Sequence, residues 1–201
     1  LSYQNVENPV VTDGSYVITG TTESDIITLA LEDLAGDGTA DQEVVRVNGN
    51  PIDVTAADGL VINASGGDDT ITITPQNGGT SIAIPRGLQI IGSEGSLDAV
   101  YVAVRPLAIA GTDVAGGGTL SGILSAGLIT MSGIENLSVT GTDGIVDQFT
   151  VSNYGAASDL QTINLSGGDS SNNDNDTLAI SMTGGPDLIT YTRSEEHTSE
   201  L

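Results

Sequence analysis

The chain lacks cysteine and tryptophan altogether, and only four of its 201 residues are basic. Without cysteine there is no disulfide framework and no thiolate metal site. The four basic residues are all arginines, while 27 aspartates and glutamates bring the formal net charge to −23. A field of this sign repels nucleic acid and anionic lipid and attracts cations. We therefore expect no nucleic-acid partner, and no run is apolar for long enough to insert into a membrane.

Histidine is nearly absent too, because the only one, His197, lies in an atypical C-terminal segment. Residues 193–201 read RSEEHTSEL, which back-translates to an adapter widely used in short-read DNA sequencing. We expect this segment to be an assembly artefact and exclude it from the reasoning on the fold. The chain begins with Leu1, so we also expect it to be an internal fragment of a longer protein, with residues 1–13 as its N-terminal edge.

What the chain does contain is aliphatic alternation and glycine. Hydrophobic residues make up 38% of the sequence, and 27 glycines interrupt the apolar runs. In the stretch INASGGDDTITI, residues 62–73, Ile71 and Ile73 alternate with threonines, which is the period of a β-strand. No stretch sustains helical spacing between helix caps. The sequence therefore predicts an all-β fold.

One phrase recurs, an aspartate followed by two apolar residues at alternate positions. It begins at six aspartates: Asp25, Asp69, Asp98, Asp147, Asp176 and Asp187. Two of the gaps between them are 29 residues, a length that suits one coil of a wide solenoid, and longer gaps could hide further coils. We predict a β-solenoid, a parallel β-helix-like repeat fragment. The alternative is a tandem pair of β-sandwich domains of about 100 residues each.

A longer sequence phrase is also repeated farther along the chain. INASGGDDTITI matches INLSGGDSSNNDNDTLAI at residues 163–180, apart from an insertion after the first aspartate. We therefore divide the chain into a first long β repeat unit, residues 14–131, and a second, truncated unit, residues 132–192.

The phrases GGDDTITI, at residues 66–73, and SGIENLSVTGTDG, at 132–144, resemble large secreted bacterial surface proteins with degenerate RTX-like, haemolysin-type calcium-binding repeats. In that family, glycine carbonyls and an aspartate of each turn coordinate calcium. The resemblance implies calcium at Gly66, Gly67, Asp68 and Asp69. The second-turn glycine and the strict nine-residue spacing of the family are missing here, so the resemblance implies isolated calcium sites.

Two further acidic loops have a composition suited to calcium, which takes six to eight oxygen ligands. The loop DSSNNDND provides Asp169, Asp174 and Asp176 among asparagines and serines. The loop DLAGDGTADQEV resembles an EF-hand loop, with Asp33, Asp37 and Asp41 at positions one, five and nine. Its twelfth position is Val44 rather than a bidentate glutamate. The competing interpretation of each loop is a solvated acidic turn whose aspartates accept backbone N–H groups.

No catalytic constellation is recognisable. We therefore expect a non-catalytic structural or adhesive segment of an extracellular bacterial surface protein, with calcium, glycans or further copies of itself as partners. The alternative is a polysaccharide-acting β-helix enzyme or a carbohydrate-binding module. Such an enzyme would need a basic residue beside paired acids, and only Arg46, Arg86 and Arg105 precede the excluded segment.

Overall fold

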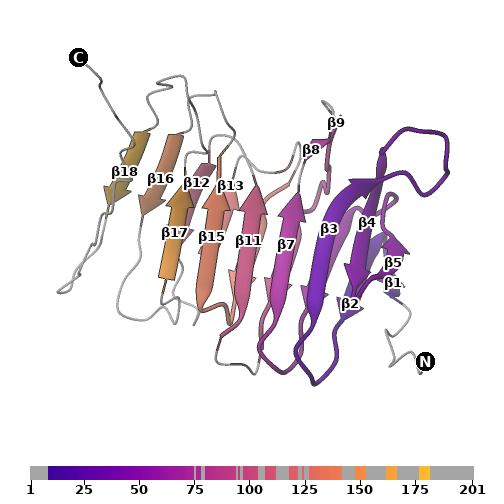
Figure 1. Cartoon of the computed structure of the whole chain (residues 1–201), viewed down its shortest axis with the longest axis horizontal. Coiled ribbons are helices and arrows are strands. Elements are labelled where there is room, and N and C mark those ends of the chain that lie inside the picture. The colour runs from indigo at the N-terminus through magenta and orange to yellow at the C-terminus, as the bar shows by residue number, and fades with distance from the viewer. Residues whose placement is uncertain are drawn as a thin grey trace, which may run out of the picture.

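All regular structure in the described part of the chain is β-strand, which confirms the all-β prediction. The computed structural model describes residues 9–74, 76–77, 80–93, 95, 97–103, 107–111, 118–121, 124, 127–141, 148–152, 162–166 and 177–181. Figure 1 shows most of the strands aligned side by side along the long axis of the molecule, from the N-terminal to the C-terminal end. Among these residues there is no helix that could cross a membrane.

Sheet A contains nine strands in the order β1-β2-β6-β10-β14-β13-β12-β16-β18. The bounds are β1 (Val10–Thr12), β2 (Ser15–Thr19), β6 (Gly59–Asn63), β10 (Leu88–Ile91), β12 (Leu107–Gly111), β13 (Gly118–Ser121), β14 (Ile129–Ser132), β16 (Gln148–Ser152) and β18 (Thr177–Ser181).

Sheet B contains seven strands in the order β17-β15-β11-β7-β3-β4-β5. The bounds are β3 (Ile26–Glu32), β4 (Gln42–Val47), β5 (Asn50–Asp53), β7 (Thr70–Thr74), β11 (Ala99–Ala103), β15 (Asn136–Thr140) and β17 (Thr162–Ser166). A small separate hairpin consists of β8 (Gln76–Asn77) and β9 (Thr80–Ser81).

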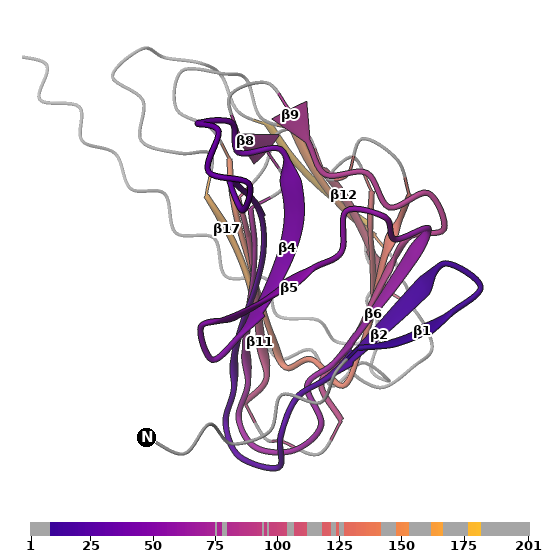
Figure 2. The same cartoon turned by 90° about the vertical axis from the view of Figure 1, so that its right-hand side faces the viewer.

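The chain passes repeatedly from one sheet to the other. It runs from β2 to β3, β6 to β7, β10 to β11, β14 to β15 and β16 to β17, each time from sheet A to sheet B. Viewed from the side, the two sheets face each other as two layers (Figure 2). Neighbouring strands from successive passages are parallel. Parallel neighbours need a crossover connection, and here a strand of the opposite sheet provides it.

The core lies between the layers and is built from aligned aliphatic residues. Ile71 of β7 pairs in register with Ile27 of β3 and with Val100 of β11, and all three are 0% exposed. Alternate residues point to the opposite face, so Thr72 lies outside. Burying a side chain of this size contributes about 1.5–3 kcal/mol. A column of such residues therefore holds each passage against the next.

Antiparallel hairpins account for the longer gaps between the repeated aspartates. Two-residue loops with positive φ at both positions, Asp13–Gly14 and Asn48–Gly49, join β1 to β2 and β4 to β5. This backbone is the type I′ turn that Asp-Gly and Asn-Gly favour. The 44 residues between Asp25 and Asp69 thus contain strands β4 and β5 at the edge of sheet B, in addition to one passage through sheet A.

Candidate functional site

Four acidic residues lie one above another where the chain enters sheet B. Asp25, Asp69, Asp98 and Glu135 immediately precede β3, β7, β11 and β15. Their exposed fractions are 1%, 1%, 0% and 8%, and they are the buried charged residues in the described part of the chain. We call these four residues the carboxylate ladder. Burial of four acids in one column is costly unless their oxygens are satisfied.

Each carboxylate of the ladder after the first accepts a hydrogen bond from the backbone of the preceding rung. The Asp25 N–H donates to Asp69 Oδ1 at 2.7 Å, and the Asp69 N–H donates to Asp98 Oδ1 at 2.8 Å. The Asp98 N–H donates to Glu135 Oε2 at 2.8 Å. These N–H groups lie at the start of the strands, where a buried donor without a partner would be destabilising. The ladder therefore extends the hydrogen-bonding of sheet B into the turns.

The first rung is fully hydrogen-bonded. Asp25 Oδ2 accepts the Thr21 N–H at 2.6 Å, within its own turn. Its other oxygen, Oδ1, accepts the side-chain amide of Asn48 at 2.5 Å. Asn48 belongs to the loop between β4 and β5, so the β4–β5 hairpin supplies the donor that ends the ladder on this side.

The two middle rungs each have one oxygen without a donor. Asp69 Oδ2 and Asp98 Oδ2 are buried and accept no hydrogen bond. In the turn before Asp69, the N–H four residues earlier, that of Ser65, donates instead to Asn63 Oδ1 at 3.0 Å. The corresponding N–H of the first rung, that of Thr21, is the one that satisfies Asp25. The middle rungs therefore carry negative charge with incomplete compensation.

The pKa values of both middle aspartates are raised. The pKa of Asp69 is raised to about 6, chiefly by burial and also by the charges of Asp98, Asp25 and Asp68, whereas the hydrogen bond from the Asp25 backbone opposes the shift. Burial likewise raises the pKa of Asp98, although the hydrogen bond from the Asp69 backbone lowers it. Both carboxylates thus favour a proton or a cation over an uncompensated charge.

Glycine at position 92 allows the β10–β11 turn to approach the β14–β15 turn closely beside Asp98. A Cβ atom on Gly92 would lie 1.8 Å from the Gly133 carbonyl oxygen and 2.6 Å from Asp98 Oδ2. No side chain fits at such distances, so glycine is required where the two turns approach. The same position therefore adjoins a carboxylate oxygen and a carbonyl oxygen. Oxygen atoms of both kinds are ligands for hard cations.

The structure separates the two aspartates of the central motif. Asp69 is a rung of the ladder, whereas Asp68 is exposed, and its N–H donates to Ser24 Oγ at 3.1 Å. The Gly66 N–H donates to the Thr21 carbonyl oxygen at 3.1 Å, and Gly67 packs closely on the turn that contains Ser24. Gly66, Gly67 and Asp68 therefore contact the preceding turn through packing and hydrogen bonds.

In the EF-hand-like loop, between β3 and β4, the aspartates accept local hydrogen bonds. Asp33 accepts the N–H groups of Gly36, Asp37 and Gly38 at 2.5, 3.1 and 2.8 Å. These bonds hold the pKa of Asp33 below its usual range, the one from Gly38 most strongly.

The other two aspartates of this loop also accept hydrogen bonds from near neighbours in the sequence. Asp37 Oδ1 accepts the Thr39 N–H at 2.9 Å, and Asp41 Oδ1 accepts the side-chain amide of Gln42. Across the described ranges, no three acidic or histidine side chains converge as ligands of one ion. Asp169, Asp174 and Asp176 lie outside the described residues.

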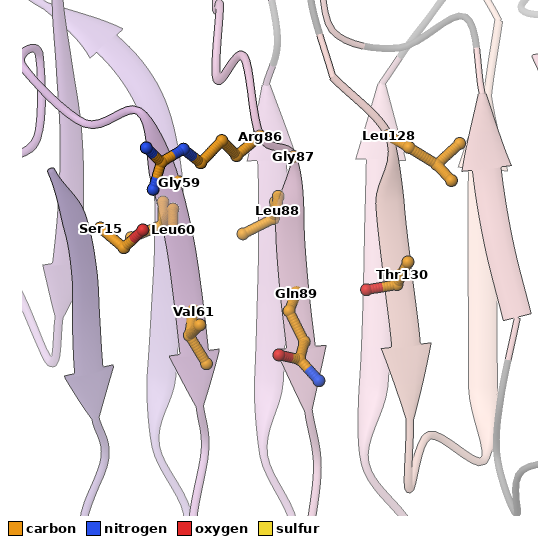
Figure 3. A pocket seen from close by; sticks show the side chains of 10 residues that line it. All are labelled: Ser15, Gly59, Leu60, Val61, Arg86, Gly87, Leu88, Gln89, Leu128 and Thr130. Atoms are coloured by element: carbon orange, nitrogen blue, oxygen red, sulfur yellow. The ribbon is translucent and has the colours of Figure 1, made fainter. Parts of the chain in front are cut away.

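Two arginines named as candidate bases have identifiable partners. Arg46 Nε donates to Glu32 Oε1 at 2.7 Å, and the pair joins the neighbouring strands β4 and β3 of sheet B. Arg86 donates to the Asp13 carbonyl oxygen at 3.1 Å. Figure 3 shows Arg86 at the end of a shallow groove of about 320 Å³ on sheet A, in which it is the only charged lining residue. Arg105 lies outside the described residues.

The sequence pattern missed the fourth rung. Glu135, with Leu137 and Val139, follows the same alternation, and a pattern that accepted glutamate in place of aspartate would have found it. Two of the predicted repeats instead lead into sheet A, because the strands that follow Asp147 and Asp176 in the sequence are β16 and β18. Asp147, Asp176 and Asp187 themselves lie outside the described residues.

No protein-family model, curated protein or solved structure matches this chain. The class of protein that can be stated is therefore the one that the architecture defines: an all-β chain of two mixed sheets joined by turns that bury a carboxylate ladder. Chemically, the two middle rungs of the ladder hold a proton at a higher pH than an ordinary aspartate does.

Proposed function

We propose that this chain is a non-catalytic structural and adhesive segment of an extracellular bacterial surface protein. The observation that carries this proposal is the carboxylate ladder, which joins successive turns end to end through Asp25, Asp69 and Asp98. A column of this kind suits a rigid, extended spacer better than a reaction centre, because its acids bind backbone groups of the chain itself. The resemblance of the GGDDTITI phrase to RTX-like repeats supports the extracellular location.

The finer architecture we propose is a β-solenoid. Each passage through sheet A and sheet B would be one coil, stacked on the next by in-register parallel strands. The step from Asp69 to Asp98, 29 residues long, would be one complete coil. Repeats of this length bury their apolar faces by stacking on neighbours.

Calcium is the proposed ligand of the acidic turns. The buried Oδ2 atoms of Asp69 and Asp98 lack donors, and Asp98 Oδ2 and the Gly133 carbonyl oxygen both lie beside Gly92. These oxygens fit a hard cation. Such a cation would compensate the negative charge of carboxylates that burial removes from water. Asp33 and Asp37, and the loop with Asp169, Asp174 and Asp176, are further proposed calcium positions.

Thermal unfolding of the 201-residue chain in millimolar calcium and in chelator tests this role. A ligand at one hundred times its Kd stabilises the folded state by about 2.7 kcal/mol. For a chain of this size that corresponds to a rise in Tm of roughly 5–10 °C. Asp69→Asn should reduce the shift, whereas Asp53→Asn, an exposed change of the same charge, should retain it. A transition that is the same in calcium and in chelator contradicts the calcium proposal.

A further inference from the structure

The outer face of sheet B carries no charged side chain from β7 to β17. Its outward positions on these four strands are Thr70, Thr72, Thr74, Ala99, Tyr101, Ala103, Asn136, Ser138, Thr140, Thr162, Asn164 and Ser166. In a chain with a net charge of −23, this is a neutral surface of hydroxyl, amide and methyl groups. The acidic residues in the described part of the chain lie instead in the turns and on β3, β4 and β5.

The parallel register arranges these groups in rows across the strands. Thr72, Tyr101 and Ser138 are direct neighbours on β7, β11 and β15, and Asn164 on β17 continues the row. Adjacent strands lie about 4.8 Å apart, so polar groups repeat at that interval. Such a row presents evenly spaced donors and acceptors around one aromatic ring.

A groove of about 330 Å³ runs beside this ring. Ala99, which is 8% exposed, lies between Leu97 and Tyr101 along the chain, and these two larger side chains are 57% and 46% exposed. Asn136 and Asn164 are among the polar residues that line the groove. A small residue between two exposed large ones makes the depression.

We propose that this groove is the adhesive site of the segment and binds a neutral glycan chain laid across the strands of sheet B. This inference rests on the adhesive role proposed above and names its surface and its ligand class. Tyr101 would pack its ring against the apolar face of a sugar, as exposed aromatic rings do with apolar surfaces. Ser138 and the amides of Asn136 and Asn164 both donate and accept hydrogen bonds, which matches sugar hydroxyls.

Charge selects the neutral class of glycan. The one charged residue that lines the groove is Asp68, an acid, and the rest of the chain is strongly negative. Uronic acids and sulfated sugars would therefore be repelled, and no basic residue lines this groove to bind them. The groove on sheet A differs, because Arg86 lines it and no aromatic residue does.

Titration of the isotopically labelled 201-residue chain with oligosaccharides tests the proposal. The probes are cellohexaose, chitohexaose and mannohexaose, with hexagalacturonate as the acidic probe, each up to about 10 mM, a range that captures Kd values on the order of 1 mM. At least one neutral probe should shift the backbone amides of β11 and β15, and hexagalacturonate should not. The proposal is overturned if no neutral probe shifts those amides, or if the acidic probe binds equally well.

Variants separate the proposed contacts from general effects. Tyr101→Ala should weaken binding of the active probe by about tenfold or more, as loss of a central aromatic contact does. Tyr101→Phe should bind nearly as well, because the ring is kept. Gln89→Ala, an exposed change on sheet A, is the matched control and should bind like the parent. Equal binding by Tyr101→Ala overturns the site.

Two further measurements show whether an absence of glycan binding reflects a wrong binding site, an unfolded chain or a dimer that covers the groove. Circular dichroism and melting of each variant report whether the stacked sheets are intact. No binding by an intact chain overturns the glycan site and leaves the structural role, whereas loss of the β-signal in the parent chain overturns the structural role itself. Sedimentation across a concentration series identifies a competing occupant. A dimer that Tyr101→Ala disrupts would make a second copy the partner of this face and overturn the glycan proposal.

Discussion

Replacing Asp69 by asparagine should stabilise the chain at neutral pH in chelator. Asp69 is 1% exposed, and its Oδ1 accepts the Asp25 N–H, while its Oδ2 accepts no hydrogen bond. Asparagine is nearly the same size and keeps an acceptor for the Asp25 N–H. It also replaces the unsatisfied oxygen with an amide that can donate. The substitution therefore removes a buried charge and preserves the ladder contact.

The expected magnitude follows from the pKa of Asp69, which burial raises from 3.8 to about 6. Each unit is worth about 1.4 kcal/mol, so ionisation destabilises the folded state by about 3 kcal/mol at pH 7.5. The folded pKa is the higher one, so protonation favours folding. The parent chain should therefore gain this stability as the pH falls from about 7 to about 4 and lose it again as the pH rises through 6.

Urea unfolding of parent and Asp69→Asn chains in chelator, from pH 4 to 7.5, measures the difference directly. Asp69→Asn should be more stable by up to about 3 kcal/mol at pH 7.5 and by under about 1 kcal/mol at pH 4. Asp53→Asn changes the same charge at an exposed position that does not act on Asp69, and it should differ from the parent by about 0.5 kcal/mol or less. A destabilised Asp69→Asn at pH 7.5, or a difference that does not change with pH, would refute the reasoning.

Two further substitutions address packing. Gly92→Ala should destabilise by about 1–3 kcal/mol in denaturant unfolding, because its Cβ would lie 1.8 Å from the Gly133 carbonyl oxygen. Gly59→Ala, whose Cβ would be 3.0 Å from the hydroxyl of Ser15, should cost clearly less, and equal costs would argue against the close turn contact. Ile71→Ala should destabilise by about 2–5 kcal/mol in the same assay, because Ile71 is 0% exposed in the centre of sheet B. Thr72→Ala on the outer face should change stability by about 0.5 kcal/mol or less, and similar losses at the two positions would contradict the inside–outside assignment.

The two hairpin turns could be predicted from short stretches of sequence alone. Asp13–Gly14 and Asn48–Gly49 are the dipeptides that type I′ turns favour, and both form such turns. Recognising the Asn48–Gly49 hairpin would have explained the long spacing between Asp25 and Asp69 without a hidden coil. The alternation at Ile71 and Ile73 likewise predicted strand β7 and its buried face correctly.

The role of the aspartates was not readable in the same way. A side chain that begins a strand can be a solvated turn residue, a metal ligand or a buried acceptor, and these choices share one sequence pattern. Asp68 and Asp69 are adjacent and chemically identical, yet one is exposed and the other is 1% exposed. Only the position of the preceding turn, whose Asp25 N–H donates to Asp69 Oδ1, distinguishes them.

Sequence alone thus determined the all-β class, the strand faces and the acidic, glycine-rich turns, because strand alternation and turn propensity act between near neighbours in the chain. The tertiary structure decided which acids align. Asp25, Asp69, Asp98 and Glu135 form one buried column because parallel register places the starts of β3, β7, β11 and β15 side by side. Register between strands many residues apart depends on the packing of both sheets and on the inserted hairpins, which no local pattern encodes.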